Sequence, residues 1–326
     1  MAFFPCSGPE QSDLLRGYLI SDCLRQMGWA SIVVPMQLTL QQRKRIMQAF
    51  QPDIVVLRTC RHALNRVEHF PGCKVVLDLD DADFFHPPMR DAITQTARDA
   101  DGVICGSRFV RDWAAQHNPD TTVIWTGTPI SDGPWPDHGD RERIVTWAQS
   151  DPLIYNHEFD FIEEVVLALA ARGTQFRFRF YGWNFPEDHP KLARLREAGV
   201  ELELIPSLAY EKFLGSLRDV AVGLSPVHPD SDFSKGKSFG KILAYIDAKV
   251  PVICSDAVDH ALFFTSESGI VSNDPEVWVD RIAALLDDPA CRQTMADNAH
   301  DDFRERLSVE TAARLSAAYL ERVAHV

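Results

Sequence analysis

The sequence lacks the features that mark several common classes of protein. It has seven cysteines, an odd number with no CxxC pair, so we expect reduced thiols and neither a disulfide framework nor a zinc site. No apolar run approaches the roughly 20 residues that a membrane-spanning helix needs. Residues 1–5 also lack the charged and apolar regions of a signal peptide. These absences predict a cytoplasmic protein without a transmembrane segment.

Several nucleotide-binding and catalytic motifs are missing as well. No predicted strand is followed by GxGxxG, and the chain contains no GxxxxGK[ST] and no GxSxG. These gaps argue against dinucleotide oxidoreductases, P-loop phosphotransferases and enzymes built on a nucleophile elbow. The histidines show no metal-ligand spacing, so no bound metal is expected.

Positive charge is also scarce. The chain has 33 lysines and arginines against 47 aspartates and glutamates, a formal net charge of −14. Such a surface repels the phosphate backbone of nucleic acids, so we expect no nucleic-acid partner. Any anionic ligand must therefore be held by a local basic patch.

What the chain does have is a repeated alternation of strand-like and helical segments. With 326 residues it exceeds a typical single domain. The predicted strands of the first part are 30–35, 53–57, 74–80, 102–105 and 121–126, and those of the second are 143–148, 175–181, 200–205, 220–226, 250–254 and 269–272. The pattern predicts an α/β protein with two Rossmann-like, doubly wound parallel-sheet domains that face a cleft.

The domain boundaries follow from composition. Residues 127–140 concentrate Gly, Pro and Asp, as an interdomain linker does. We therefore expect a first domain at 1–136 and a second at 137–306. A helical tail follows, and its last helix, 307–326, could pack back on the first domain.

The most informative segment is a lysine-rich loop that opens into a helix between two buried-type strands. It carries Lys235, Lys237 and Lys241, with Ser238 able to cap the helix and Gly240 allowing close approach of a ligand. A helix N-terminus with nearby ammonium groups favours phosphate. The loop predicts a diphosphate site, with an ordinary solvated turn as the alternative.

A second candidate site is an acidic cluster that follows the strand near residue 77. Its members, all within nine positions, are Asp78, Asp80, Asp81, Asp83 and His86. Carboxylates so close repel one another, so one should have a raised pKa and could act as a general base. We favour Asp81 or Asp83, with His86 as the competitor. The alternatives are a divalent metal site and a structural role in capping the helix that begins near residue 89.

Several segments together resemble the GT-B nucleotide-sugar glycosyltransferases, in particular the large retaining bacterial group known as glycosyl transferases group 1. They are FRFYGW (178–183), RDVAVGLSP (218–226), KSFGKILAYIDAKVPVICSD (237–256) and GIVSNDPEVWVDRIAALLDDP (269–289), with ADGVICGSRFVRDW (100–113) and VIWTGTPI (123–130) in the first half. The resemblance covers most of the chain in the right order. It implies an enzyme of glycan biosynthesis that moves a hexose-type sugar to an acceptor hydroxyl.

The resemblance also implies the ligands. The donor would be a nucleoside diphosphate sugar, most simply a UDP- or GDP-sugar, with no tightly bound cofactor and no metal. The first domain would bind the acceptor, which is a glycan, a lipid-linked compound or another hydroxyl compound. Peripheral contact with a membrane stays open.

Site residues follow from the same resemblance. The donor diphosphate would lie at Lys237, Ser238, Phe239, Gly240 and Lys241, with Lys235 adding charge, and the nucleoside would lie near Ile205, Pro206, Ser207, Tyr181, Gly182 and Trp183. Relatives commonly carry a glutamate for the donor ribose where this chain has Ala244. Asp247, one turn later, could replace it or be a surface aspartate near a helix end.

Further residues occupy positions that commonly face a cleft. Arg16 and Arg58, with Asp80, lie at expected sheet ends, where the arginines could bind an acidic acceptor or a phosphate, or form structural salt bridges. Ser107 matches the helix-opening serine of the family, and N-capping also explains it. The turn at Thr126 and Gly127 could line the cleft or be a simple turn.

Two other functions stay open at this point. The Ala244 departure suits a catalytically inactive nucleotide-sugar binding or partner protein. A nucleotide-sugar epimerase would instead use the acidic cluster for proton transfer on the sugar. The stereochemical outcome of a transfer is open too, because the relatives suggest retention whereas a carboxylate base suits inversion.

Overall fold

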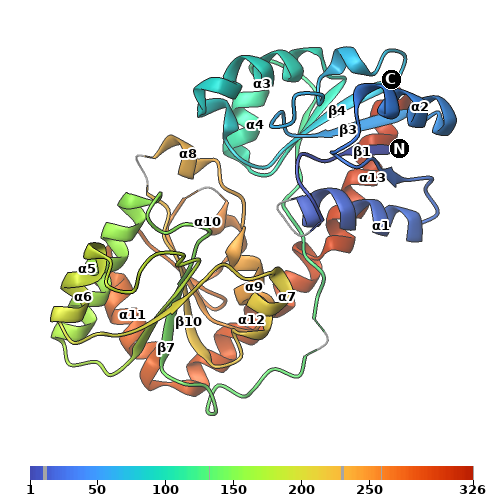
Figure 1. The fold of residues 1–326 in the computed structure, drawn as a ribbon. Helices are drawn as coiled ribbons and strands as arrows, with labels where there is room; N and C mark the ends of the chain where they lie inside the picture. Colours follow the sequence, from blue (N-terminus) through green and yellow to red (C-terminus); the bar gives the residue numbers. More distant parts are fainter. Residues whose placement is uncertain (10–12, 132, 229–230, 258, 326) are drawn as a thin grey trace. The chain divides into compact units, whose positions relative to one another are not determined.

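The computed structural model describes residues 1–9, 13–131, 133–228, 231–257 and 259–325, and these form two compact units (Figure 1). Unit 1 comprises Met1–Ile130, Ser231–Ser238 and Glu305–Val326, and unit 2 comprises Ser131–Asp230 and Phe239–Arg304. The predicted boundaries were 136 and 306. Residue 132, inside the predicted linker 127–140, lies outside the described residues.

Unit 1 is built on a six-stranded parallel sheet with the order β2-β1-β3-β4-β5-β6. Its strands are β1 (Ala2–Phe4), β2 (Ile32–Val33), β3 (Ile54–Arg58), β4 (Lys74–Leu79), β5 (Gly102–Cys105) and β6 (Thr121–Val123). The sequence analysis named no strand at β1, because a three-residue apolar run at the chain start has no preceding turn signal. In the structure this strand pairs with both β2 and β3, so it lies next to the edge strand β2.

Helices cover both faces of this sheet. They are the π-helical turn Leu14–Tyr18 with α1 (Leu19–Gln26), then α2 (Leu40–Phe50), α3 (Pro87–Asp99), α4 (Arg108–Ala114), the short α8 (Asp232–Lys235) and α13 (Val309–His325). Because side chains alternate along a strand, Ile54 and Val56 pack with α1 and α13, whereas Val55 and Leu57 join the core on the other face. Figure 1 shows α13, from the end of the chain, lying beside α1.

Unit 2 repeats the plan with the strand order β12-β11-β10-β7-β8-β9, again all parallel. The strands are β7 (Ile144–Ala148), β8 (Arg177–Tyr181), β9 (Glu201–Ile205), β10 (Val220–Ser225), β11 (Val252–Cys254) and β12 (Ile270–Val271). The helices are α5 (Asn156–Ala171), α6 (Ala193–Glu197), α7 (Tyr210–Gly215), α9 (Lys241–Asp247), α10 (His260–Phe263), α11 (Pro275–Asp287) and α12 (Pro289–Arg306). Each predicted strand of the second half is present.

Parallel strands determine where ligand-binding side chains can gather. The carboxyl ends of all strands in a parallel sheet meet at one edge, and the loops that follow them form the usual binding surface. In unit 1 that edge carries the ends of β3 and β4 with the acidic cluster. None of the helices in the described residues is long and apolar enough to cross a membrane.

Candidate active site

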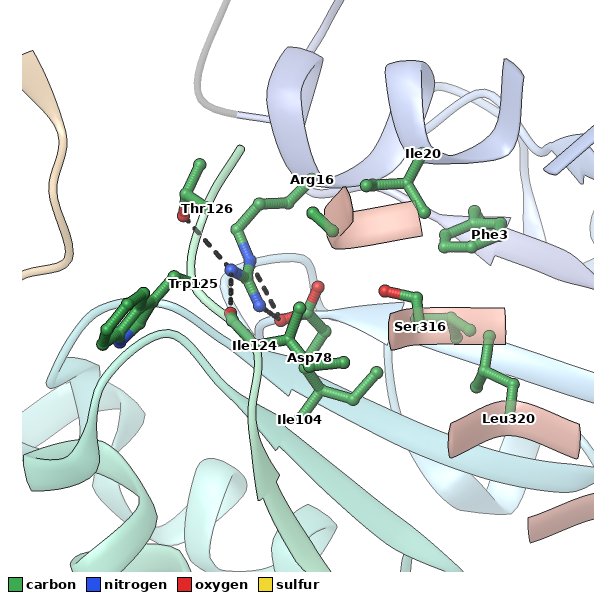
Figure 2. Close-up of a pocket in the computed structure, with 12 residues that line it drawn as sticks. Phe3, Arg16, Ile20, Asp78, Ile104, Ile124, Trp125, Thr126, Ser316 and Leu320 are labelled. Atoms are coloured by element: carbon green, nitrogen blue, oxygen red, sulfur yellow. Dashed lines mark hydrogen bonds and ion pairs between the residues drawn. The ribbon is translucent and has the colours of Figure 1, made fainter. Parts of the chain in front are cut away.

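The first group at the carboxyl edge of unit 1 is an ion pair that joins β4 to the segment after β6. Nη2 of Arg16 lies 2.5 Å from Oδ1 of Asp78, and Nη1 donates to the carbonyl oxygen of Ile124 and to Oγ1 of Thr126 at 2.8 and 3.1 Å (Figure 2). The cavity beside these groups measures about 10 Å³, room for one water molecule at most. Arg16 therefore forms the structural salt bridge that was the alternative to an acceptor contact.

Arg58 is the centre of a larger buried network. Its Nε donates to Asp13 at 2.9 Å, Nη1 lies 3.1 Å from Oδ2 of Asp78, and Nη2 donates to Asp80 at 3.1 Å. Burial lowers the pKa of Arg58, but Asp78, Asp80 and Asp13 outweigh it and raise this pKa well above its ordinary value. With its side chain 1% exposed, Arg58 also serves as a structural ion-pair partner.

Arg61 divides the acidic cluster into two kinds of carboxylate. Its Nε and Nη2 each donate to one oxygen of Asp83 at 2.7 Å, and Nη2 also donates to Oδ2 of Asp81 at 2.9 Å. Asp83 is buried by this two-point contact, whereas the Asp81 side chain is 31% exposed. Of the two favoured aspartates, only Asp81 combines a single contact with access to solvent.

The protonation of Asp81 differs from that of its neighbour. Burial, followed by repulsion from Asp80, raises the pKa of Asp81 to about 6, although Arg61 lowers it. Burial would also raise the pKa of Asp80, but Arg58, Arg16 and Arg61 outweigh it and hold this pKa below its ordinary value. Asp81 is thus the group of this pair that exchanges a proton near neutral pH.

The two alternative explanations of the acidic cluster were helix capping and a metal site. Helix α3 begins at Pro87, and its N-cap residue, His86, makes no side-chain capping bond, so the prediction that aspartates cap this helix is wrong. His86 itself is exposed. Within the described ranges no group of three or more His, Cys, Asp or Glu residues could hold a metal ion. The carboxylates bind arginines instead.

The first half of the lysine loop, taken here as residues 231–241, is docked on the acidic cluster within unit 1. A Cβ atom on Gly236 would lie 2.2 Å from Cβ of Ala82, so the two backbones approach as closely as glycine permits. Oγ of Ser107 donates to the carbonyl oxygen of Gly236 at 3.5 Å, and Oγ of Ser238 lies 3.4 Å from Oγ1 of Thr126. Five of the predicted positions thereby gather at one edge: Asp81, Ser107, Thr126, Lys237 and Ser238.

Ser107 and Gly127 also have clear local roles. Ser107 accepts a hydrogen bond from the amide of Val110 at 3.3 Å and so caps α4, as its alternative explanation predicted. A Cβ atom on Gly127 would lie 2.4 Å from the carbonyl oxygen of Ser308. Glycine is therefore required there for the close approach of the segment that leads into α13.

The second half of the lysine loop belongs to unit 2. The ring of Phe239 packs against His260 and Phe263, with centroids 5.6 and 5.5 Å away. Helix α9 begins at Lys241 with Gly240, at φ 46°, as its N-cap residue, so the prediction that Ser238 caps this helix is wrong. Because α9 has only seven residues, ammonium charges must contribute more than its dipole to any phosphate binding.

The ammonium group of Lys241, at the start of α9, lies beside a row of packed aromatic rings. Nζ of Lys241 lies 5.7 Å from the ring centroid of Phe213, which packs edge-on against Tyr181 at 4.9 Å. Lys235, in unit 1, pairs with Asp232 at 3.0 Å, a contact of two half-exposed groups that contributes little. Lys237 is half-buried.

The predicted nucleoside residues lie at the carboxyl ends of β8 and β9. Gly182 has φ 81°, and a Cβ atom there would lie 1.7 Å from the carbonyl oxygen of Gln149. Nδ2 of Asn184 donates to Oγ of Ser207 at 3.0 Å, and the Ser207 amide donates back to Oδ1 of Asn184 at 3.2 Å. Oγ of Ser207 also donates to the carbonyl oxygen of Ser150 at 3.4 Å. These bonds join the loops that follow β7, β8 and β9.

The aromatic residues of this group face the protein interior. Tyr181 and Trp183 are each 3% exposed, with the Tyr181 hydroxyl donating to the carbonyl oxygen of Ser216 at 3.0 Å. Ile205 lines an open hollow of about 410 Å³ on the same side, and Pro206 and Ser207 are exposed. Of the predicted nucleoside residues, Pro206 and Ser207 are therefore the exposed ones, whereas Tyr181 lines the hollow with little exposed surface.

Helix α9 carries no exposed carboxylate. Ala244 is buried, and Asp247 is fully buried, with its Oδ1 accepting bonds from the amide and hydroxyl of Ser131 at 2.9 and 3.0 Å. Burial raises the pKa of Asp247 above its ordinary value although both bonds from Ser131 lower it. The interpretation of Asp247 as a surface aspartate is therefore wrong.

Sequence reasoning missed Asp13, Thr59, Arg61 and Asn184. Arg61 could have been found, because it lies three residues after Arg58 at the end of a predicted strand. Thr59 gives no signal in the sequence, yet it has φ 44°, an uncommon conformation for a β-branched residue. The roles of Asp13 and Asn184 depend on contacts between loops that only the folded chain brings together.

Sequence comparison provides no relative. No protein-family model matches the chain, and a search of the curated proteins finds no significant match. Whatever can be learned by similarity therefore comes from three-dimensional structure.

Solved structures do match, over nearly the whole chain. A sucrose-phosphate synthase from Thermosynechococcus elongatus superposes with a TM-score of 0.74 at 14% identity, covering 100% of this chain and 99% of that one. HepE from Anabaena, solved in complex with UDP and glucose, gives a TM-score of 0.71 at 16% identity over 98% of this chain and 99% of its own. TarM from S. aureus gives 0.64 at 13% identity over 88% of this chain, which spans 59% of the TarM chain.

These similarities agree with the architecture of each unit. Both units carry a six-stranded, all-parallel sheet covered by helices, and a long C-terminal helix completes unit 1. At identities of 13 to 16% the similarity concerns the fold. The predicted fold is confirmed: the chain has the GT-B fold, two Rossmann-like units of the kind found in nucleotide-sugar glycosyltransferases.

Proposed function

We propose that the protein is a glycosyltransferase that moves a hexose-type sugar from a nucleoside diphosphate sugar to an acceptor hydroxyl. The observation that carries the proposal is Asp81, a part-exposed carboxylate with a pKa of about 6, beside which the lysine loop is docked through Gly236. A proton acceptor and the first half of a loop that would bind the diphosphate lie together in unit 1, and they would supply the two ends of a transfer reaction. The GT-B fold supports the proposal by analogy.

The proposed reaction is a displacement at the anomeric carbon. The acceptor oxygen forms a bond to that carbon, and the bond between the carbon and the diphosphate oxygen breaks, with the electron pair leaving on the diphosphate. The hydroxyl proton passes to the carboxylate of Asp81. Lys235, Lys237 and Lys241 stabilise the charge on the leaving diphosphate, so the proposed chemistry uses no metal. A base at Asp81 favours inversion of the anomeric configuration.

Donor recognition is assigned to both halves of the lysine loop and to the 205–207 loop. Ser207, oriented by Asn184, and the adjacent backbone would contact the nucleobase. UDP is our first choice of nucleotide, because the HepE structures contain UDP or UDP-glucose, with GDP as the second. The acceptor is a glycan, a lipid-linked compound or another hydroxyl compound bound at the carboxyl edge of unit 1, in the cytoplasm.

One observation favours a second function. Ala244 and Asp247 leave α9 without an exposed carboxylate for a donor ribose. A protein that binds a nucleotide sugar without turning it over is therefore the competing proposal.

A panel of UDP-, GDP- and dTDP-sugars separates the candidate functions. We expect release of nucleoside diphosphate together with a glycosylated acceptor, and we expect Asp81→Asn to lose at least a hundredfold in kcat while the donor Kd stays unchanged. The control is Asp91→Asn, an exposed aspartate on α3. Binding without turnover would support the non-catalytic alternative, an isomerised donor would support an epimerase, and full activity of Asp81→Asn would remove Asp81 from the mechanism.

A further inference from the structure

Arg61 stands out among the arginines of unit 1 because its guanidinium meets the two aspartates between which the sequence could not decide. Nε and Nη2 donate hydrogen bonds to the two oxygens of Asp83, and Nη2 also donates to one oxygen of Asp81. A planar fork held at two points by a carboxylate has a fixed orientation. The contact to Asp81 is therefore made by a donor whose direction is set by Asp83.

The backbone that carries Arg61 is held in an unusual conformation. Thr59, 1% exposed, has φ 44°, where a β-branched residue is strained. Its amide donates to the carbonyl oxygen of Asp78 at 3.0 Å, and its Oγ1 accepts from the amide of Arg61 at 3.3 Å. Oγ1 also donates to Sγ of Cys6 at 3.3 Å. These contacts hold a strained turn that directs Arg61 toward the acidic cluster.

We propose that Arg61 is a positioning residue for the transfer reaction: it is anchored on both oxygens of Asp83 and holds Oδ2 of Asp81, so that Oδ1 of Asp81 receives the acceptor proton. This assignment rests on the proposed function. Asp81 and Asp83 have the same chemistry, and they differ in the number of hydrogen bonds that each accepts from the Arg61 guanidinium. Asp83 is then excluded as the base, because both of its oxygens are bound to Arg61.

The electrostatic effect of Arg61 on Asp81 opposes that of its other neighbours. Burial, Asp80 and Asp83 raise the pKa of Asp81, whereas the charge of Arg61 and its hydrogen bond lower it. Two other charged or titratable residues lie on the adjoining segments: Arg58, which pairs with Asp80, and the exposed His86. The lysine loop, docked at Ala82, adds three further charged groups to this part of unit 1: Asp232, Lys235 and Lys237. Removal of the Arg61 charge should therefore raise the pKa of Asp81 further.

The test compares Arg61→Gln with the wild-type enzyme by kinetics over pH 5 to 9. We expect the limb of kcat that rises with pH to move upward by about 1 pH unit, because an opposite charge within hydrogen-bond distance shifts a carboxyl by about that much or more. A midpoint that moves from about 6 to about 7 lowers kcat about fivefold at pH 6 and about twofold at pH 7, and this loss recovers by pH 9, with an unchanged KM for the donor. Arg61→Lys, which keeps the charge but not the fork, should restore the pH profile and only part of kcat.

The matched control is Arg66→Gln. Arg66 belongs to the same loop but donates to the backbone carbonyl oxygens of Cys60, His62 and Asn65. Its loss should leave the pH profile of kcat unchanged. If Arg61→Gln lowers kcat equally at every pH, the residue has a structural role only and the proposal is overturned.

A second measurement separates this proposal from the proposed function. The carboxyl carbon of Asp81 can be titrated by NMR in protein labelled at aspartate, with Asp81→Asn assigning the signal. A midpoint that rises in Arg61→Gln supports the assignment, and an unmoved midpoint in an active enzyme overturns it alone. A wild-type protein that transfers no sugar overturns the proposed function, and the catalytic role of Arg61 falls with it.

Discussion

At the residue scale, the chemistry of Asp81 is set by an imbalance of charge. The network at the carboxyl edge of unit 1 contains the arginines Arg16, Arg58 and Arg61 and the aspartates Asp13, Asp78, Asp80, Asp81 and Asp83. Five aspartates share three arginines, so the carboxylates together lack two counter-charges. Asp81 accepts one hydrogen bond from an arginine that also makes two to Asp83, and the pKa of Asp81 is raised.

This imbalance predicts that the ionised Asp81 lowers the free energy of unfolding at high pH. A carboxyl whose folded-state pKa is raised favours the protonated form in the folded state, so its ionisation destabilises the protein as pH rises through about 6. We expect Asp81→Asn to raise the free energy of unfolding at pH 8 by on the order of 1 kcal/mol, after allowance for partial exposure. Denaturant unfolding at several pH values measures it.

The same comparison at pH 4 is the internal control. There Asp81 is protonated in the folded state and about half protonated in the unfolded state, so the advantage of Asp81→Asn should shrink to a small fraction of its value at pH 8. An advantage that is the same at pH 4 and pH 8 would mean that Asp81 is not titrating near 6. A gain at high pH, coupled to lost turnover, is the pattern of a residue kept for function.

At the scale of elements, the contact between the lysine loop and the acidic cluster depends on one glycine. Gly236→Ala would place a methyl group 2.2 Å from Cβ of Ala82 and 2.8 Å from its backbone nitrogen, so the loop must move. Because Asp232 is exposed and Lys235 and Lys237 are half-buried, the loop can shift, and the fold should survive with an unfolding midpoint within a few degrees of the wild type. We expect at least a tenfold loss of kcat/KM.

The control for this variant is Gly215→Ala at the end of α7. A Cβ atom there would meet nothing within 4 Å, and the residue needs no positive φ. Its activity should equal that of the wild type. Full activity of Gly236→Ala would show that the docked position of the lysine loop is not required for the reaction.

The elements also show how far sequence patterns reach. Alternating apolar and amphipathic segments predicted the two parallel-sheet domains, because buried parallel strands must be apolar on both faces, and the resemblance of several segments to a known family predicted the GT-B fold. The same patterns could not give the start of α9 at Lys241, which depends on the φ of 46° at Gly240. Nor could they give the burial of Asp247, whose hydrogen bonds come from Ser131, more than a hundred residues earlier in the chain.

The candidate site divides in the same way. Proximity in sequence identified the acidic cluster and predicted a raised pKa within it, since neighbouring carboxylates repel one another, but the arginines decide which carboxylate has it. The choice between Asp81 and Asp83 depended on Arg61, which approaches from a different strand end. Arg16 and Arg58 were recognised as sheet-end residues, but the aspartates that neutralise them are contributed by several loops.

At the scale of the whole molecule, charge makes the lysine loop the decisive element for donor binding. With a formal net charge of −14, the protein as a whole repels a nucleoside diphosphate. Arg16, Arg58 and Arg61 are occupied by aspartates. Donor affinity should therefore depend on Lys237 and Lys241, and on Lys235, whose surface pair with Asp232 is weak, and it should fall with increasing salt.

The most direct test is calorimetric titration of the wild-type protein and Lys237→Ala with UDP, GDP and uridine. We predict that a nucleoside diphosphate binds the wild type, that Lys237→Ala weakens it about tenfold and that uridine affinity is unchanged, since one charge-assisted contact is worth about 1.5 kcal/mol. Lys44→Ala, an exposed lysine on α2, should bind as the wild type does. If neither nucleoside diphosphate binds at all, the protein is not a nucleotide-sugar glycosyltransferase of the kind proposed.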